Sequence, residues 1–130
     1  MATWRLEKKF RFEASHELPH HPGKCRRLHG HSWVGVAMLE ANNIHADGPE
    51  AGMVVDFGIL GERIDNLVES HLDHWHLNET TGLENPTSEE LARWVYERLV
   101  GRIPFLVGVR IEETCTSACE YWPEAGGGEA

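Results

Sequence analysis

The chain has little positive charge, few cysteines and no apolar run long enough to cross a membrane. Its 130 residues carry 12 Lys and Arg against 21 Asp and Glu, a formal net charge of −9. A general nucleic-acid binder would show a basic field, so this balance argues against that class. Since there is also no signal-peptide pattern at the start, we expect a cytoplasmic protein that binds neither nucleic acid nor membrane.

Cysteine is scarce, whereas histidine is abundant. Cys25, Cys115 and Cys119 are an odd number and do not suggest a disulfide framework. In a reducing compartment such residues are free thiols or metal ligands. Three residues separate Cys115 from Cys119, which is not a strong zinc spacing, so we interpret both as structural thiols. The nine histidines are scattered through distinct contexts and are the unusual feature of the composition.

The hydrophobic pattern predicts a single α+β domain over residues 1–123, followed by a flexible glycine-rich tail over residues 124–130. Apolar residues alternate with polar or charged ones over residues 4–14 and 107–114, and residues 31–42 are rich in apolar residues, which is typical of strands. Residues 116–122 form a short fourth candidate. Helical spacing begins after an N-cap candidate, Asp56, and ends within residues 72–78. A capping box of Thr87 and Glu90 opens a second helix. This grouping predicts an antiparallel four-stranded sheet with two helices packed on one face.

Residues 25–31 read Cys-Arg-Arg-Leu-His-Gly-His and form the main candidate site. In an extended segment His29 and His31 share one face. His16 lies on the inward face where the first strand ends, and pairing of the first two strands would bring it to the other two. Catalytic zinc sites commonly use three protein ligands and keep a fourth position open. The alternative is three unrelated histidines, one in the core and two in a turn.

The loop around Cys25 carries a second candidate. A thiolate near a metal and two arginines would have a lowered pKa and could act as a base or nucleophile. Lys24, Arg26 and Arg27 could also hold an anionic substrate such as a phosphate chain. An ordinary small buried cysteine in a solvated loop is the alternative.

Two more sites contain carboxylates. Asp73 stands beside His74, and a carboxylate can orient a neighbouring imidazole for acid/base chemistry, although His71 and His76 compete for this role. Glu113 continues the inward face of the last long strand, while Glu112 points outward. An inward carboxylate needs a partner, either a ligand with paired N–H donors or an arginine.

Six segments together resemble the 6-pyruvoyl-tetrahydropterin synthase family, and most closely its queuosine-pathway branch. They occur in family order between about residue 4 and about residue 122, and the short spacing between Cys25 and His29 is similar to that branch. The segments are Phe-Glu-Ala-Ser-His (12–16), Cys-Arg-Arg-Leu-His-Gly-His (25–31), Leu-Asp-His (72–74), Leu-Asn (77–78), Glu-Asn-Pro-Thr-Ser-Glu (84–89) and Glu-Thr-Cys (113–115).

The resemblance implies a role for each candidate. It implies that three histidines bind Zn²⁺, that one thiol is the general base, and that one Asp-His pair relays protons on the opposite side of the substrate. It also implies a carboxylate that anchors the pterin ring. We further expect the threonine beside it to contact the substrate and the two arginines of the basic loop to contact the triphosphate. In this order, the residues are His16, His29 and His31; Cys25; Asp73 and His74; Glu113 and Thr114; Arg26 and Arg27.

The implied reaction converts 7,8-dihydroneopterin triphosphate to 6-carboxy-5,6,7,8-tetrahydropterin, with release of acetaldehyde and triphosphate. The resemblance also implies the tunnelling fold, in which the sheets of a homo-oligomer, usually a hexamer, join into a barrel with active sites at subunit interfaces. A pyruvoyl-tetrahydropterin synthase on the same scaffold is the first alternative. A three-histidine zinc hydrolase and a non-enzymatic metal-binding module are more distant ones.

Overall fold

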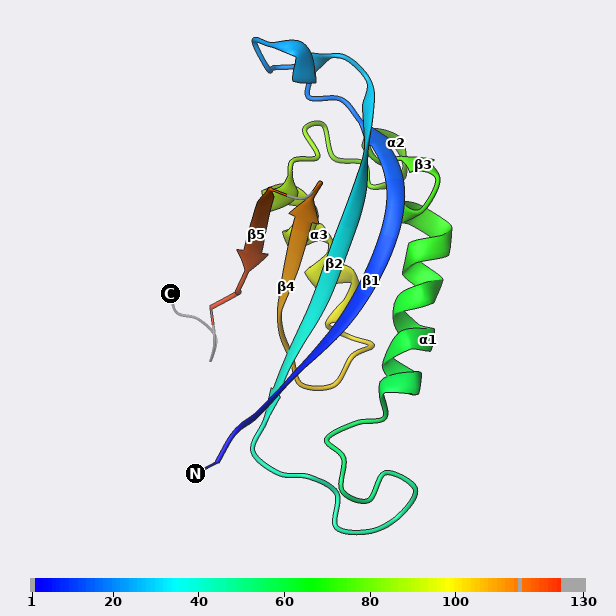
Figure 1. The fold of residues 1–130 in the computed structure, drawn as a ribbon, viewed down its shortest axis with the longest axis vertical. Coiled ribbons are helices and arrows are strands. Elements are labelled where there is room, and N and C mark those ends of the chain that lie inside the picture. The colour runs from blue at the N-terminus through cyan, green and yellow to red at the C-terminus, as the bar shows by residue number, and fades with distance from the viewer. Residues whose placement is uncertain (1, 115, 125–130) are drawn as a thin grey trace.

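The computed structural model describes residues 2–114 and 116–124, so Cys115 and most of the predicted tail lie outside the described residues. Five strands form one sheet in the order β3-β1-β2-β4-β5 (Figure 1). The α+β class is confirmed, and the sheet is antiparallel except where β3 joins β1. No helix in the described ranges is long and apolar enough to cross a membrane.

A long hairpin dominates the sheet. β1 (Trp4–His16) pairs with β2 (His29–Ala41) along its whole length, from Trp4 opposite Ala41 to His16 opposite His29. β4 (Leu106–Glu113) pairs with β2, and β5 (Ser117–Tyr121) pairs with β4. The predicted strands are therefore present, and the first one extends as far as His16. This extension matters because it places His16 within the paired region.

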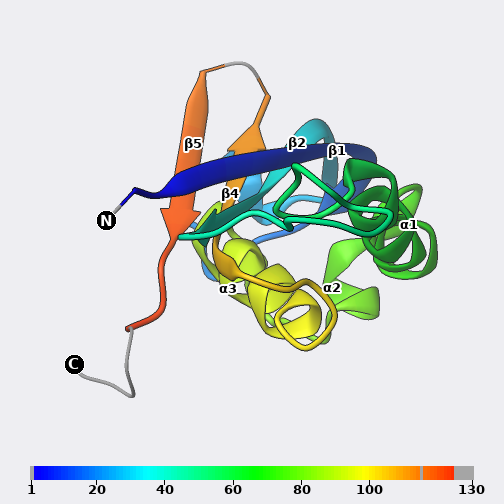
Figure 2. The same cartoon turned by 90° about the horizontal axis from the view of Figure 1, so that it is seen from below.

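The helices cover one face of this sheet, as Figure 2 shows from below. α1 (Phe57–Leu67) continues as a π-helical turn over Val68–Leu72, and α3 (Ser88–Leu99) packs beside β4 and β5. Both N-caps predicted from the sequence form: Asp56 accepts from the Gly58 N–H at 2.8 Å, and Thr87 accepts from the Glu90 N–H at 3.1 Å. The covered face of the sheet holds the buried core, including Phe12 and Trp33.

The predicted counts of four strands and two helices were wrong. The segment expected to end the first helix instead forms β3 (Trp75–His76), parallel to β1, and a short helix α2 (Leu77–Thr80). The cause is a pair of hydrogen bonds to the main chain of β1: the Glu13 N–H donates to the side-chain Oδ1 of Asp73 at 2.8 Å, and the His74 N–H donates to the Glu13 carbonyl at 2.6 Å. This long-range pairing holds His74 at a φ of 65° and ends the helical path.

Candidate functional site

Three histidines converge at one end of the β1–β2 hairpin. His16 lies opposite His29, and Ala14 lies opposite His31, so all three imidazoles share the helix-covered face of the sheet. One nitrogen from each ring lies within 4.8 Å of the other two. The Nε2 atoms of His16 and His29 are 3.0 Å apart. The geometry that the alternation and the strand pairing predicted is therefore present.

The other ring nitrogen of each histidine contacts an oxygen outside the cluster. His16 Nδ1 lies 2.8 Å from the Pro86 carbonyl, and His29 Nδ1 lies 2.7 Å from the Arg27 carbonyl. His31 Nδ1 lies 2.9 Å from Thr114 Oγ1. Histidines that bind a metal usually donate their second N–H to such an oxygen, which fixes the tautomer and the ring orientation. All three Nε2 atoms are thereby left facing one another.

The donor set fits a tetrahedral zinc ion. Nitrogens bound to zinc at 2.0–2.1 Å lie roughly 3.4 Å apart in a tetrahedral site, close to the separation of the His16 and His29 Nε2 atoms. His31 Nε2 is buried and has no hydrogen-bond partner in the described part of the chain. Burial lowers the pKa of His16, which favours the neutral imidazole that a metal requires. A cation is the partner that satisfies this arrangement.

Glu113 closes one side of the cluster. Its Oε2 lies 2.8 Å from His31 Nε2 without the alignment of a hydrogen bond, and 3.9 Å from His16 Nε2. Its Oε1 accepts a hydrogen bond from Ser88 Oγ at 2.9 Å. The inward position predicted for this carboxylate is correct, and in the described ranges its side chain contacts histidines and a serine rather than an arginine. Sequence reasoning gave no role to Ser88. The one indication of its position was that it directly follows the helix cap Thr87.

Cys25 lies on the loop that joins the two strands. A 3₁₀ turn over Lys24–Arg26 carries it, and its carbonyl accepts from the Leu18 N–H at 3.0 Å. The side chain is half-buried, and the group of metal-ligand atoms does not include its sulfur. Arg26 and Arg27 are exposed on the same loop, and their side chains form no ion pair with any described residue. The loop thus brings a thiol and two free cations to the end of the hairpin where the histidines lie.

Asp73 and His74 lie at the other edge of β1. Asp73 Oδ2 is 2.9 Å from His74 Nδ1, and the hydrogen bond from the Glu13 N–H, followed by the bond to His74, lowers the pKa of this carboxyl. The His74 side chain is 80% exposed. Within the described residues no hydrogen bond or ion pair joins this pair to His16, His29 or His31.

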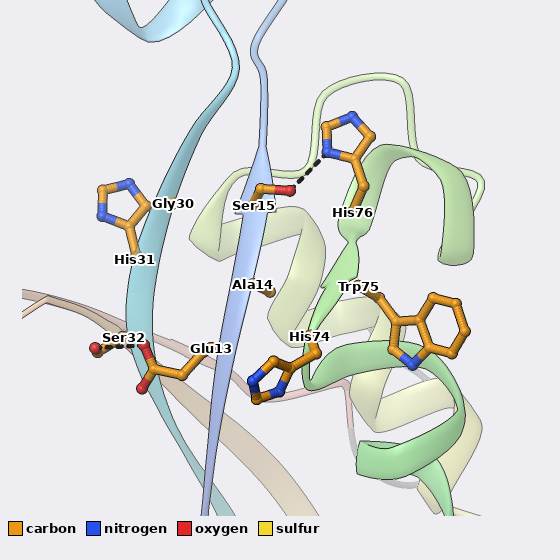
Figure 3. A pocket seen from close by; sticks show the side chains of 9 residues that line it. All are labelled: Glu13, Ala14, Ser15, Gly30, His31, Ser32, His74, Trp75 and His76. Carbon is orange, nitrogen blue, oxygen red and sulfur yellow. Dashed lines mark hydrogen bonds between the residues drawn. The ribbon is translucent and has the colours of Figure 1, made fainter.

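An open hollow of about 450 Å³ adjoins His74, and His31 contributes to the opposite side of its lining (Figure 3). Its polar lining includes Glu13 and Ser15 from β1, and His76 from β3, whose Nδ1 lies 2.9 Å from Ser15 Oγ. His71, the other competitor for the proposed relay, lies 2.6 Å from Ser70 Oγ through its Nδ1. Of His71, His74 and His76, only His74 has a ring that is both paired with a carboxylate on its own loop and largely exposed.

Comparisons with known proteins identify the family of this chain. The family model described as 6-pyruvoyl tetrahydropterin synthase matches residues 5–124. The chain is 49% identical over 120 residues to the 6-carboxy-5,6,7,8-tetrahydropterin synthase of Synechocystis, covering 92% of this chain and 93% of the relative. It is 30% identical to the enzyme of the same name from Bacillus subtilis, covering 96% and 89%.

Solved structures share the fold as well. The 6-pyruvoyl tetrahydropterin synthase of Caenorhabditis elegans superposes with a TM-score of 0.81 at 26% identity, covering 95% of this chain and 98% of that one. The match of the family model spans both the hairpin that carries the three histidines and the strand that ends at Glu113. The chain therefore belongs to the 6-pyruvoyl tetrahydropterin synthase family.

Proposed function

We propose that this protein is a zinc-dependent lyase that converts 7,8-dihydroneopterin triphosphate and one water to 6-carboxy-5,6,7,8-tetrahydropterin, acetaldehyde and triphosphate. This activity would belong to queuosine (7-deazapurine) biosynthesis. The observation that carries the proposal is the convergence of three histidine Nε2 atoms beside the Glu113 carboxylate. Among the possible products, the relative that is 49% identical and bears the name of the carboxy-forming enzyme favours 6-carboxytetrahydropterin.

His16, His29 and His31 would hold the zinc ion. Bound there, zinc would supply Lewis-acid chemistry, lowering the pKa of hydroxyl groups on the substrate side chain. Glu113 would anchor the pterin by accepting hydrogen bonds from its ring nitrogen and amino group. Because Ser88 holds one carboxylate oxygen, the other stays directed at the histidine cluster. The anchored ring would then present its side-chain carbons to the metal.

Two groups would move protons on those carbons. Cys25 would act as the general base from the loop next to the metal ligands, and His74 would act on the opposite side of the substrate. Asp73 would hold the His74 ring through Nδ1, which keeps Nε2 free for proton transfer. Thr114, Arg26 and Arg27 would contact the substrate, the two arginines through the triphosphate.

The position of His74 favours an oligomer. Because its exposed ring forms no hydrogen bond or ion pair with the three histidines in the described ranges, we propose that His74 of a second subunit completes each site. This proposal includes the tunnelling fold, with a homo-hexamer and active sites at the subunit interfaces. The long β1 strand pairs with β3 at only two residues on its outer side, so most of that edge is open to another sheet.

An anaerobic assay tests the proposed reaction directly. Zinc-loaded protein is incubated with 7,8-dihydroneopterin triphosphate, and the products are identified by mass. We expect acetaldehyde and 6-carboxytetrahydropterin in equal amounts, and their loss in Cys25→Ala. No turnover by protein with zinc bound would overturn the proposal.

A pyruvoyl-forming activity is the second candidate, since the solved relative from Caenorhabditis elegans bears that name. A pyruvoyl pterin formed without acetaldehyde would select it. A zinc hydrolase would need no pterin anchor, so Glu113→Gln would leave its rate unchanged. A non-enzymatic metal-binding module would show no turnover and no effect of Cys25→Ala.

A further inference from the structure

The three candidate zinc ligands are oriented by different kinds of partner. For His16 and His29 the outer nitrogen contacts a main-chain carbonyl, of Pro86 and Arg27 respectively. For His31 it contacts a side chain, the hydroxyl of Thr114, at 2.9 Å. A carbonyl is supplied by any residue at its position, whereas a hydroxyl depends on the residue itself. One of the three orienting contacts can therefore be removed by substitution.

The backbone holds Thr114 in an unusual conformation to make this contact. Its φ is 58°, in the left-handed region that β-branched residues avoid. Its N–H donates to the carbonyl of Ser32, the neighbour of His31 on β2, at 3.2 Å. This bond continues the β4–β2 pairing by one step beyond Glu113, which lies opposite Trp33. Strain of this kind persists where surrounding contacts impose it, and such residues cluster at functional sites.

The direction of the hydrogen bond follows from the opposite side of the ring. His31 Nε2 is buried and donates to no described residue, and its 2.8 Å contact with Glu113 Oε2 lacks hydrogen-bond alignment. A ring with its proton on Nδ1 donates it to Thr114 Oγ1 and leaves Nε2 with a free lone pair. The candidate ligand atoms of the three histidines all lie within 4.8 Å of one another.

We propose that Thr114 is a positioning residue of the metal centre, whose hydroxyl accepts the Nδ1–H of His31 and aims Nε2 at the ion. This inference rests on the proposed zinc site, and it gives Thr114 a role in addition to the proposed substrate contact. It also means that two consecutive residues at the end of β4, Glu113 and Thr114, would serve the pterin and the metal respectively. Glu113 lies at the cluster as the proposed pterin anchor, while Thr114 orients a metal ligand.

The zinc dissociation constant of the metal-free protein, measured by competition with a chromophoric chelator, tests this role. Thr114→Val keeps the size and β-branching but removes the hydroxyl, and we expect zinc to bind about tenfold more weakly. Thr114→Ser keeps the hydroxyl and should remain close to wild type. Thr116→Val makes the same change at an exposed threonine two residues away and should have no effect.

Two further measurements separate positioning from folding. Thr114→Gly relieves the left-handed strain, so its melting temperature without metal should not fall, while its zinc affinity should fall as in Thr114→Val. Cobalt(II) in the Thr114→Val protein should show a shifted visible spectrum, because a reoriented imidazole alters the coordination geometry.

The outcomes distinguish this inference from the proposed function. If the wild-type protein binds no zinc, or if the His31→Ala variant binds zinc as tightly as the wild type, the proposed zinc site itself is wrong. If wild-type protein binds zinc through His31 but Thr114→Val has unchanged affinity and an unchanged cobalt spectrum, only the role of Thr114 is wrong. A raised Michaelis constant in that variant with unchanged zinc affinity would overturn the positioning role and leave Thr114 with the substrate contact alone.

Discussion

Two candidate regions flank β1 and are built in opposite ways: an inner region of His16, His29 and His31 on the helix-covered face, and an outer region of Asp73 and His74 at the opposite edge. On the inner face His16 is 1% exposed, and each histidine of the cluster has a fixed partner on its outer nitrogen. At the other edge the His74 side chain is 80% exposed, on a loop with a positive φ. The first region is preorganised within one chain. The second is held in place by its backbone but its imidazole faces outward, which is the arrangement expected of a group that serves a neighbouring subunit.

The largest expected effect is on the reaction rate, in an experiment that places Cys25 and His74 on different chains. Cys25→Ala and His74→Ala each remove one proposed proton-transfer group and should lower the rate about 10²–10⁴-fold. If each site combines Cys25 of one subunit with His74 of another, refolding an equal mixture of the two variants restores complete sites. By random assembly about a quarter of the sites would regain both groups.

The activity of the refolded mixture, compared with each variant refolded alone, is the measurement. Cys25→Ala mixed with Asp73→Asn should also complement, because Asp73 and His74 lie on the same loop. His74→Ala mixed with Asp73→Ala should not complement. Equal activities in the mixture and in the single variants would place both groups in one chain and remove the basis for interface sites.

Zinc should stabilise the protein through the histidine cluster, and this stabilisation should not depend on Asp73 or His74. A ligand present at a thousand times its dissociation constant stabilises the folded state by about 4 kcal/mol, which would raise the melting temperature by roughly 15 °C. His29→Ala removes a half-buried ligand and should abolish this rise, whereas His74→Ala should retain it in full. Thermal melts with and without added zinc make the comparison. A loss of the rise in His74→Ala would show that the two regions are not independent.

How far sequence reasoning reached differs between these regions. The three histidines could be found because strand alternation fixes which face each one occupies, and antiparallel pairing of consecutive strands fixes which ends meet. β3 could not be found because two residues carry no alternation, and the pairing depends on main-chain groups of Glu13, some 60 residues away. Thr114 and Ser88 show the same limit, since each acts through a contact with a distant strand or helix.

The two tryptophans nearest these regions should differ in their contribution to stability. Trp33 is 1% exposed, and its ring centroid lies 5.1 Å from that of His16 and 5.3 Å from that of His31. Trp75 is 46% exposed. Each indole N–H donates to a carbonyl, of Ala14 and Glu69 respectively. Trp33→Phe should lower the free energy of unfolding by about 2 kcal/mol, and Trp75→Phe by less than about 1 kcal/mol.

Urea denaturation of the metal-free proteins measures both values without a contribution from zinc. The zinc affinity of the two variants adds a second readout, since Trp33 packs against two candidate zinc ligands, His16 and His31, and Trp75 packs against none in the described ranges. Equal losses of stability would show that the inner region is no better packed than the outer one.

The smallest expected effect is electrostatic and confined to the outer region. Hydrogen bonding from the Glu13 N–H, followed by His74, lowers the pKa of Asp73 below 3.8. A carboxyl whose pKa is lower in the folded state stabilises the protein above its unfolded-state pKa, and this stabilisation is lost as the pH falls through the folded-state value. Asp73→Asn keeps an oxygen that can accept from Glu13 but removes the charge. The difference in unfolding free energy between wild type and Asp73→Asn should therefore be constant from about pH 5 to 7 and shrink below about pH 4.

Asp47→Asn is the matched control, because Asp47 is exposed on a loop and has no hydrogen bond or ion pair with any described residue. Its difference from wild type should stay near zero across the same range. A difference for Asp73→Asn that is equally large at pH 3 and pH 7 would mean that the aspartate acts through its shape rather than its charge. Asp73 would then position the loop without holding the imidazole of His74 electrostatically, and the outer region would rely on its backbone pairing with Glu13 alone.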